Sequence, residues 1–190
     1  GCGNIGKEIA LFLQHSSFFH LKYVHDLVPL DGFIKWLWLP GNVQAVSFAD
    51  LVEKSELIIE AASKEAVEKL LQQNLKNKKV LILSTGGLLG KKHDHLDIII
   101  PSGAVAGIDA LKAVAGQIDT IRLITTKSPQ SLQGAPYIIN QGIDLRGIKE
   151  KKTIFSGSVQ DVIRGFPSNV NVAVTISLAV KKDVTVEVVV

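Results

Sequence analysis

The stretch Gly1-Cys2-Gly3-Asn4-Ile5-Gly6 has the pattern G-x-G-x-x-G, and apolar residues at helical spacing follow it as far as Gln14. In a phosphate-binding loop, the first glycine permits a tight turn and the second lets the backbone approach a pyrophosphate. The third glycine packs a helix closely on a strand. The N–H groups that open the helix lack intrahelical partners and carry partial positive charge, which suits a diphosphate. The pattern therefore predicts a dinucleotide-binding loop formed by Gly1, Gly3, Asn4, Ile5 and Gly6.

Both ends of the sequence predict that this chain is a piece of a longer protein. A loop of this type follows a buried strand, and no residue precedes Gly1. Residues 184–190 read as a strand with no turn after it. We therefore expect the first strand and a C-terminal segment to be missing.

An acidic residue lies at the spacing expected for such a site. Residues 22–26 read as a short buried strand that ends in a carboxylate, and Asp26 follows Gly6 by 20 residues. A carboxylate there accepts hydrogen bonds from the adenosine ribose hydroxyls. It favours NAD over NADP, because a 2′-phosphate would meet a like charge, but it does not forbid NADP. The alternative is a solvated aspartate in a turn.

Composition excludes several classes of protein. Of the 190 residues, 46% are hydrophobic and 21% are charged, which is typical of a globular chain rather than a disordered one. The net charge is +3, and the basic clusters are short and lack interleaved aromatic residues, so we expect no nucleic-acid binding. No uninterrupted apolar run reaches the roughly 18 residues that span a bilayer, so no membrane partner is expected. The single cysteine cannot form an internal disulfide, which favours the cytoplasm.

Strands and helices alternate through the first part of the chain. Strands are expected at 57–61, 80–84 and 97–100, and helices at 64–75 and 104–115. This order predicts an α/β fold whose Rossmann-like, doubly wound parallel sheet occupies residues 1–116, without its first strand.

The second part of the chain has few crossover helices. Strands are expected at 120–126, 153–157 and 184–190, with a capping box at residues 158–161 and a helix at 170–180. This pattern predicts a second, α+β substrate domain at residues 117–190.

Small residues follow the expected strands of the first domain. Ala62 and Ser63 come directly after the strand at 57–61, at the edge of the sheet where such folds bind ligands. They leave room for a flat cofactor, and the alternative is ordinary turn chemistry. The apolar segment Trp36-Leu37-Trp38 either covers the adenine side of the site or caps the edge of the sheet.

Several segments resemble the L-aspartate dehydrogenase family, and they occur in the family's order over essentially the whole chain. Besides the glycine loop, which is not specific, they are Glu60-Ala61-Ala62-Ser63, the segment Pro101-Ser102-Gly103-Ala104 through Leu111, Thr125-Thr126-Lys127-Ser128-Pro129 and residues 166–173. The resemblance implies the oxidative deamination of L-aspartate to iminoaspartate and oxaloacetate with NAD or NADP, feeding NAD biosynthesis. It also implies a homodimer formed through the second domain.

The resemblance assigns roles to four further residues. It places Ala104 and Asn171, with Asn169 beside the latter, in contact with the cofactor. An asparagine offers both a donor and an acceptor to a nicotinamide carboxamide, and the alternative is helix capping. Lys127 matches a basic position and would face a substrate carboxylate; the alternative is a surface charge.

The resemblance leaves the catalytic group unassigned. It places the active-site histidine after the strand that ends at Val190, so none of the five histidines present is named. His93-Asp94-His95 offers two metal ligands without a clear third, and a solvated loop is predicted instead of a metal site. Two alternatives stay open: a homoserine-dehydrogenase-like oxidoreductase and a non-catalytic nucleotide-binding module.

Overall fold

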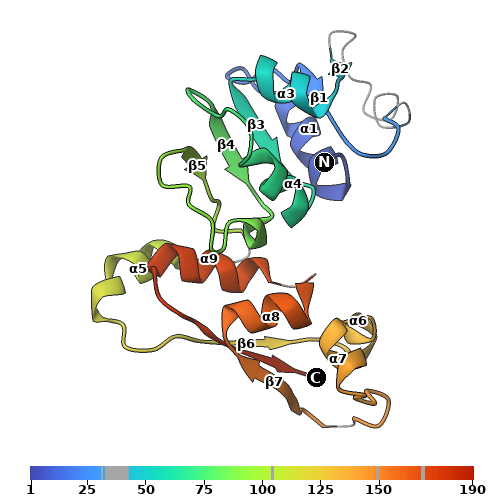
Figure 1. Cartoon of the computed structure of the whole chain (residues 1–190), viewed down its shortest axis with the longest axis vertical. Helices are drawn as coiled ribbons and strands as arrows, with labels where there is room; N and C mark the ends of the chain where they lie inside the picture. Colours follow the sequence, from blue (N-terminus) through green and yellow to red (C-terminus); the bar gives the residue numbers. More distant parts are fainter. Residues whose placement is uncertain (31, 33–42, 104, 149, 168–169) are drawn as a thin grey trace. The chain divides into compact units, whose positions relative to one another are not determined.

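The computed structural model describes all residues except 31, 33–42, 104, 149 and 168–169, and the chain divides into two compact units (Figure 1). These units are Gly1–Pro101 and Ser102–Val190. The functional boundary that the sequence places after residue 116 stays a prediction. The proposals for Trp36-Leu37-Trp38, Ala104 and Asn169 concern residues that lie outside the described part.

The first unit alternates helices with short parallel strands. In chain order its elements are α1 (Asn4–Gln14), β1 (Tyr23–Val24), β2 (Gln44–Ala45), α3 (Phe48–Lys54), β3 (Leu57–Glu60), α4 (Lys64–Leu70), β4 (Lys79–Ile82), the 3₁₀ turn η1 (Thr85–Gly87) and β5 (Asp97–Ile99). β1 pairs in parallel with β2, and β3, β4 and β5 form a separate parallel sheet in that order (Figure 1).

Buried branched residues explain why β3 and β4 form strands in the core of this unit. Ile58 of β3 lies opposite Val80 of β4, and both are buried. Branched apolar side chains pack well on a pleated sheet, so these runs form strands that are covered by helices. Helix α4 approaches η1 closely, because a Cβ at Gly87 would lie 2.6 Å from the Cβ of the fully buried Val67. The small residue is therefore required there.

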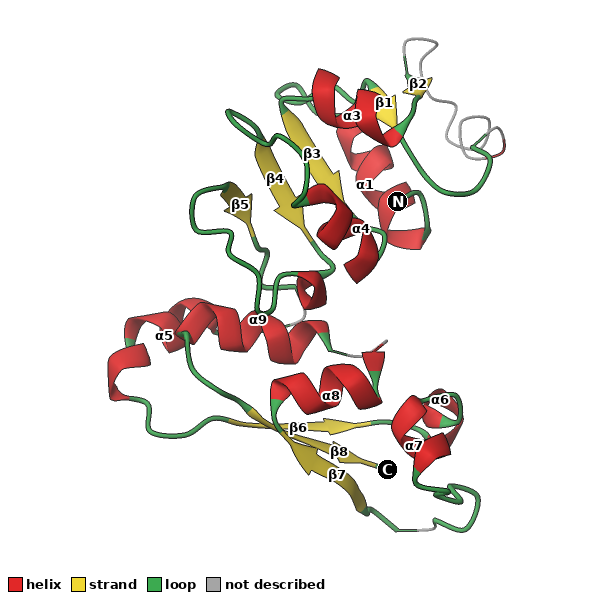
Figure 2. Ribbon diagram, in the orientation of Figure 1, coloured by secondary structure: helices red, strands yellow, loops and turns green. Residues whose placement is uncertain are grey.

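The second unit is an α+β unit. Its elements are α5 (Ile108–Ala113), the 3₁₀ turn η2 (Ala115–Gln117), β6 (Arg122–Thr126), α6 (Pro129–Leu132), α7 (Pro136–Asn140), β7 (Thr153–Gly157), α8 (Val159–Gly165), α9 (Asn171–Val180) and β8 (Thr185–Val189). β8 lies in the middle of the sheet, parallel to β6 and antiparallel to β7. Helices α8 and α9 pack against each other over this sheet (Figure 2).

Aromatic and branched side chains fill the core of the second unit. Tyr137, Phe155 and Phe166 form a cluster with ring centroids 5.1 to 5.4 Å apart. Val186 and Val188 of β8 are buried in the same unit. Helix α8 opens with the predicted capping box, in which Ser158 and Asp161 exchange side-chain and backbone hydrogen bonds.

Among the described residues, no helix combines the length and the apolar character needed to cross a membrane.

Candidate functional site

The glycine loop opens helix α1, and each of its three glycines has a different surrounding. A Cβ at Gly6 would lie 2.1 Å from the carbonyl oxygen of Gly1, and a Cβ at Gly1 would lie 2.5 Å from that of Ala61. Such approaches are far below contact distance, so both positions require glycine. A Cβ at Gly3 would meet no atom of the described residues within 4 Å. Gly3 therefore keeps an open side at the start of the helix, where a ligand can approach the backbone.

Among the described residues, no side chain caps the first N–H groups of helix α1. Gly3 is the N-cap residue and has no side chain, and the first turn carries no acidic residue. The helix is 11 residues long, so its peptide dipoles add up to partial positive charge at this end. An anion that sits beside Gly3 would meet both the unpaired N–H groups and this charge.

Asp26 lies against the glycine loop, and its role toward the adenosine ribose stays a prediction. Its Oδ2 accepts a hydrogen bond of 2.6 Å from the N–H of Cys2, and its Oδ1 accepts from Leu27 (2.7 Å) and Val28 (3.3 Å). Partial burial by itself raises the pKa of the Asp26 carboxyl, but these hydrogen bonds outweigh it and the net pKa is lowered. The carboxylate is therefore held ionised beside the loop.

The turn after β3 forms the other wall of the loop. Ala62 touches the first glycine, since a Cβ at Gly1 would lie 2.6 Å from the Cβ of Ala62. Ser63 is the N-cap of α4, and its hydroxyl accepts from the N–H of Ala66 at 3.3 Å. The turn chemistry that the sequence left as an alternative is thus present at Ser63. The cofactor roles of Ala62 and Ser63 stay predictions.

Sequence reasoning missed the contacts of Glu60, the last residue of β3. Its side chain is only 5% exposed and accepts hydrogen bonds from Ala62 and from Ser84, which follows β4. One signal was available, because a glutamate directly after Leu57-Ile58-Ile59 is a charged residue at the end of a buried strand.

Two residues that the sequence predicts to bind cofactor or substrate, Asn171 and Lys127, belong to the second unit. Asn171 is the first residue of α9 and is exposed, and the N-cap position is held by Val170. Lys127 follows β6 and is half-buried, with its backbone N–H bonded to the carbonyl of Val189 at 2.8 Å. Among the residues that the structure describes, no acidic side chain forms an ion pair with Lys127. The roles of Asn171 and Lys127 stay predictions.

His25 and His93 each lie against a backbone carbonyl oxygen. His25 packs edge-on against Phe48, and its Nδ1 lies 2.9 Å from the carbonyl oxygen of Val46. The Nδ1 of His93 lies 2.9 Å from the carbonyl oxygen of Lys91. Within the described residues, no group of three histidine, cysteine or acidic side chains is arranged to hold a metal ion.

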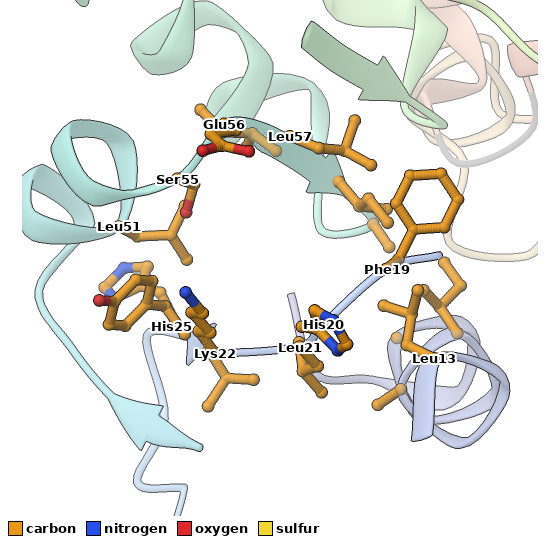
Figure 3. Close-up of a pocket in the computed structure, with 18 of the residues that line it drawn as sticks. Leu13, Phe19, His20, Leu21, Lys22, His25, Leu51, Ser55, Glu56 and Leu57 are labelled. Carbon is orange, nitrogen blue, oxygen red and sulfur yellow. The ribbon is translucent and has the colours of Figure 1, made fainter. Parts of the chain in front are cut away.

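A cavity of about 660 Å³ in the first unit shares only part of its lining with the predicted cofactor site (Figure 3). Its apolar walls include Leu13 of α1, Leu21 before β1 and Leu57 of β3. Gly1 and Gly6 reach it, but Gly3, Asp26, Ala62 and Ser63 do not line it. The space separates β1 from β3, which belong to different sheets.

Comparison with known proteins identifies the family. Residues 1–99 match the family model of the homoserine dehydrogenase NAD-binding domain, and residues 109–190 match that of the C-terminal domain of aspartate dehydrogenase. The L-aspartate dehydrogenase of Nitrosopumilus maritimus is 33% identical over 192 residues, which is 94% of this chain and 71% of that protein. The L-aspartate dehydrogenase of Methanocella arvoryzae is 34% identical, with the same coverage of both chains. The chain belongs to the L-aspartate dehydrogenase family.

A solved structure supports the same assignment. The crystal structure of aspartate dehydrogenase from Thermotoga maritima matches 100% of this chain and 75% of its own, with a TM-score of 0.72 and 30% identity. Together with the NAD-binding family model, it confirms the predicted α/β, Rossmann-like fold and the resemblance to L-aspartate dehydrogenases. The glycine loop and Asp26 lie within the part that matches the NAD-binding domain.

Proposed function

We propose that this protein is an NAD(P)-dependent L-aspartate dehydrogenase. L-Aspartate, water and NAD(P)⁺ give oxaloacetate, ammonium, NAD(P)H and a proton. The observation that carries the proposal is the hydrogen bond from Cys2 to Asp26. It joins a phosphate-binding loop to a ribose-binding carboxylate in a chain of the L-aspartate dehydrogenase family.

The residues of the first unit fit a dinucleotide. The open side of Gly3 and the first N–H groups of α1 bind the diphosphate. Asp26 accepts hydrogen bonds from ribose hydroxyls, and Ala62 and Ser63 border the cofactor. In the second unit, we propose that Ala104 and Asn171 contact the nicotinamide. When bound, the nicotinamide supplies the acceptor for the hydride that leaves the aspartate α-carbon.

We propose that Lys127 binds a carboxylate of the substrate. Lys127 is half-buried, and none of the described acidic residues forms an ion pair with it. A dicarboxylate needs such a cation, because each carboxylate loses hydration when it enters the site.

We further propose the fate of the product, the compartment and the oligomeric state. The iminoaspartate formed would feed NAD biosynthesis in the cytoplasm, and the enzyme would act as a homodimer through the unit that contains β6, β7 and β8.

Steady-state kinetics on protein expressed from the complete coding sequence test this proposal. Formation of reduced nicotinamide is followed by absorbance with L-aspartate, D-aspartate and L-homoserine as substrates. Activity with L-aspartate, and with neither of the other two, is expected. L-Homoserine is the alternative substrate that matters most, because the first 99 residues match a homoserine dehydrogenase domain. Activity on homoserine without activity on aspartate would reject the proposal.

A further inference from the structure

Glu60 is a buried carboxylate with three donors directed at it. Its Oε1 accepts from the N–H of Ala62 (2.7 Å) and from the hydroxyl of Ser84 (2.9 Å), and its Oε2 accepts from the N–H of Ser84 (2.9 Å). Only 5% of the residue is exposed. The side chain therefore connects the backbone after β3 with the backbone after β4, at the edge of the sheet where parallel α/β folds bind ligands.

These contacts continue to the glycine loop. Ala62, held by Glu60, touches Gly1, since a Cβ at Gly1 would lie 2.7 Å from its Cα. Gly1 in turn touches Gly6, because a Cβ at Gly6 would lie 2.1 Å from the carbonyl oxygen of Gly1. The position of Ala62 thus limits where Gly1, and with it the start of α1, can lie.

We propose that Glu60 is a positioning residue for the cofactor site. Its carboxylate fixes the turn at Ala62, and this turn sets the course of the glycine loop that binds the diphosphate. Glu60 touches no part of the cofactor itself. This inference rests on the proposed function for its ligand, a nicotinamide dinucleotide.

Geometry makes the carboxylate hard to replace. A carboxylate accepts hydrogen bonds at both oxygens, whereas a carboxamide accepts at one oxygen and donates from its nitrogen. In either orientation, a glutamine at position 60 directs its NH₂ group at a backbone N–H, that of Ser84 or that of Ala62. One buried backbone donor then loses its partner although size and shape are unchanged.

The test compares Glu60→Gln with Asp50→Asn in protein expressed from the complete coding sequence. Asp50 lies in α3 of the same unit, where its side chain accepts a hydrogen bond from the Ser47 hydroxyl and forms an ion pair with Lys54. We expect Glu60→Gln to weaken NADH or NADPH binding by about 5- to 30-fold in calorimetry. Asp50→Asn should bind like wild type.

Hydrogen exchange of the protein without cofactor provides a second readout. Glu60→Gln should accelerate exchange in residues 61–63 and also in residues 1–6, whereas Asp50→Asn should change neither segment. Wild-type cofactor affinity in a folded but less stable Glu60→Gln would overturn the proposal, because the carboxylate would then serve stability alone.

A milder variant covers the case in which Glu60→Gln does not fold. Ser84→Ala removes one of the three donors and keeps the backbone bond, so it should weaken cofactor binding by about threefold. Unchanged affinity in that variant would overturn the proposal. If wild type binds neither cofactor, the proposed function fails, and exchange at residues 1–6 alone decides the role of Glu60: faster exchange supports it and unchanged exchange overturns it.

Discussion

Asp26 combines two tasks in a single side chain. It orders the glycine loop by accepting the N–H of Cys2, and it holds the next turn by accepting from Leu27 and Val28. A carboxylate has about four lone-pair positions, so three bonds leave capacity for a ribose hydroxyl. Because its pKa is lowered, the group is ionised at neutral pH, and in the proposed site it would repel a 2′-phosphate.

Removing the Asp26 charge should change the choice of cofactor. Asp26→Ala should weaken NAD binding by about tenfold or more, the range for a lost hydrogen bond to a charged group. NADP binding should weaken less, because repulsion of the 2′-phosphate disappears at the same time. Calorimetry with both cofactors measures the ratio. Asp26→Asn also removes the charge, but its single amide oxygen can accept on only one side, so either the N–H of Cys2 or the N–H of Leu27 loses its acceptor. An unchanged NAD to NADP ratio in both variants would contradict the ribose assignment.

Lys127 is expected to act on the substrate and not on the cofactor. Lys127→Ala should raise the KM for aspartate by about tenfold, the range for one charge-assisted contact, with little change in the KM for NAD(P). The exposed Lys151 of the same unit gives a matched control, Lys151→Ala, which should behave like wild type. Equal aspartate KM values for the two variants would remove Lys127 from the site.

At the scale of the element, the glycines at the start of α1 are expected to differ in role. Gly6 is required for packing, whereas Gly3 is expected to leave room for the cofactor. Gly6→Ala places a Cβ 2.1 Å from a backbone oxygen that cannot move without moving the loop, so it should lower both stability and cofactor affinity. Gly3→Ala adds a Cβ in open space at φ −70°, so the free energy of unfolding should change little. Cofactor affinity should still fall, because the Cβ occupies the side from which the diphosphate approaches.

Chemical denaturation and cofactor calorimetry on both glycine variants measure this separation. The third variant, Gly116→Ala, changes a glycine of η2 whose added Cβ also meets nothing within 4 Å. It should leave cofactor affinity unchanged. Full affinity in Gly3→Ala would show that the diphosphate does not approach that side of α1.

Elements with strong local patterns were predictable from the sequence. The apolar runs of β3 and β4 gave strands within one or two residues of their observed bounds, and the spacing of Ser158 and Asp161 gave the capping box. The two-residue strands β1 and β2 are too short for periodicity to define, and β2 was not predicted. The helix expected at 64–75 is α-helical only as far as Leu70.

The candidate site was predictable where a motif fixes its spacing. Asp26 was expected near the glycine loop because the spacing from the loop to the ribose-binding acid is a property of the βαβ unit, and the structure places it there; its role toward ribose stays a prediction. Glu60 was not found, because its partner Ser84 lies 24 residues further along the chain and no local pattern relates the two. Such contacts follow from the pairing of β3 with β4, which is tertiary information.

At the scale of the whole molecule, hydrogen-bonded carboxylates connect pH to stability. Glu187 of β8 forms a two-bonded ion pair with Arg122 of β6, at 2.6 and 2.7 Å, and these bonds lower the pKa of Glu187. Hydrogen bonds from Arg146 lower the pKa of Asp144, and those from Ser158 lower the pKa of Asp161. Each carboxyl therefore releases its proton more readily in the folded state than in the unfolded chain.

The lowered pKa values determine how the free energy of unfolding changes with pH. Carboxyls with lowered pKa values stabilise the fold above their unfolded values, 3.8 for Asp and 4.5 for Glu, and this contribution disappears as the pH falls through the folded values. The free energy of unfolding should therefore decrease from about pH 5 downwards, and Glu187→Gln should flatten the decrease. Urea unfolding followed by circular dichroism at a series of pH values measures both slopes, with Glu150→Gln as the exposed control from the same unit.

Added salt should reduce the difference in pH slope between wild type and Glu187→Gln, because Arg122 is exposed and its charge is screened. Identical pH slopes for wild type and Glu187→Gln would show that the bond between β6 and β8 contributes nothing to acid stability.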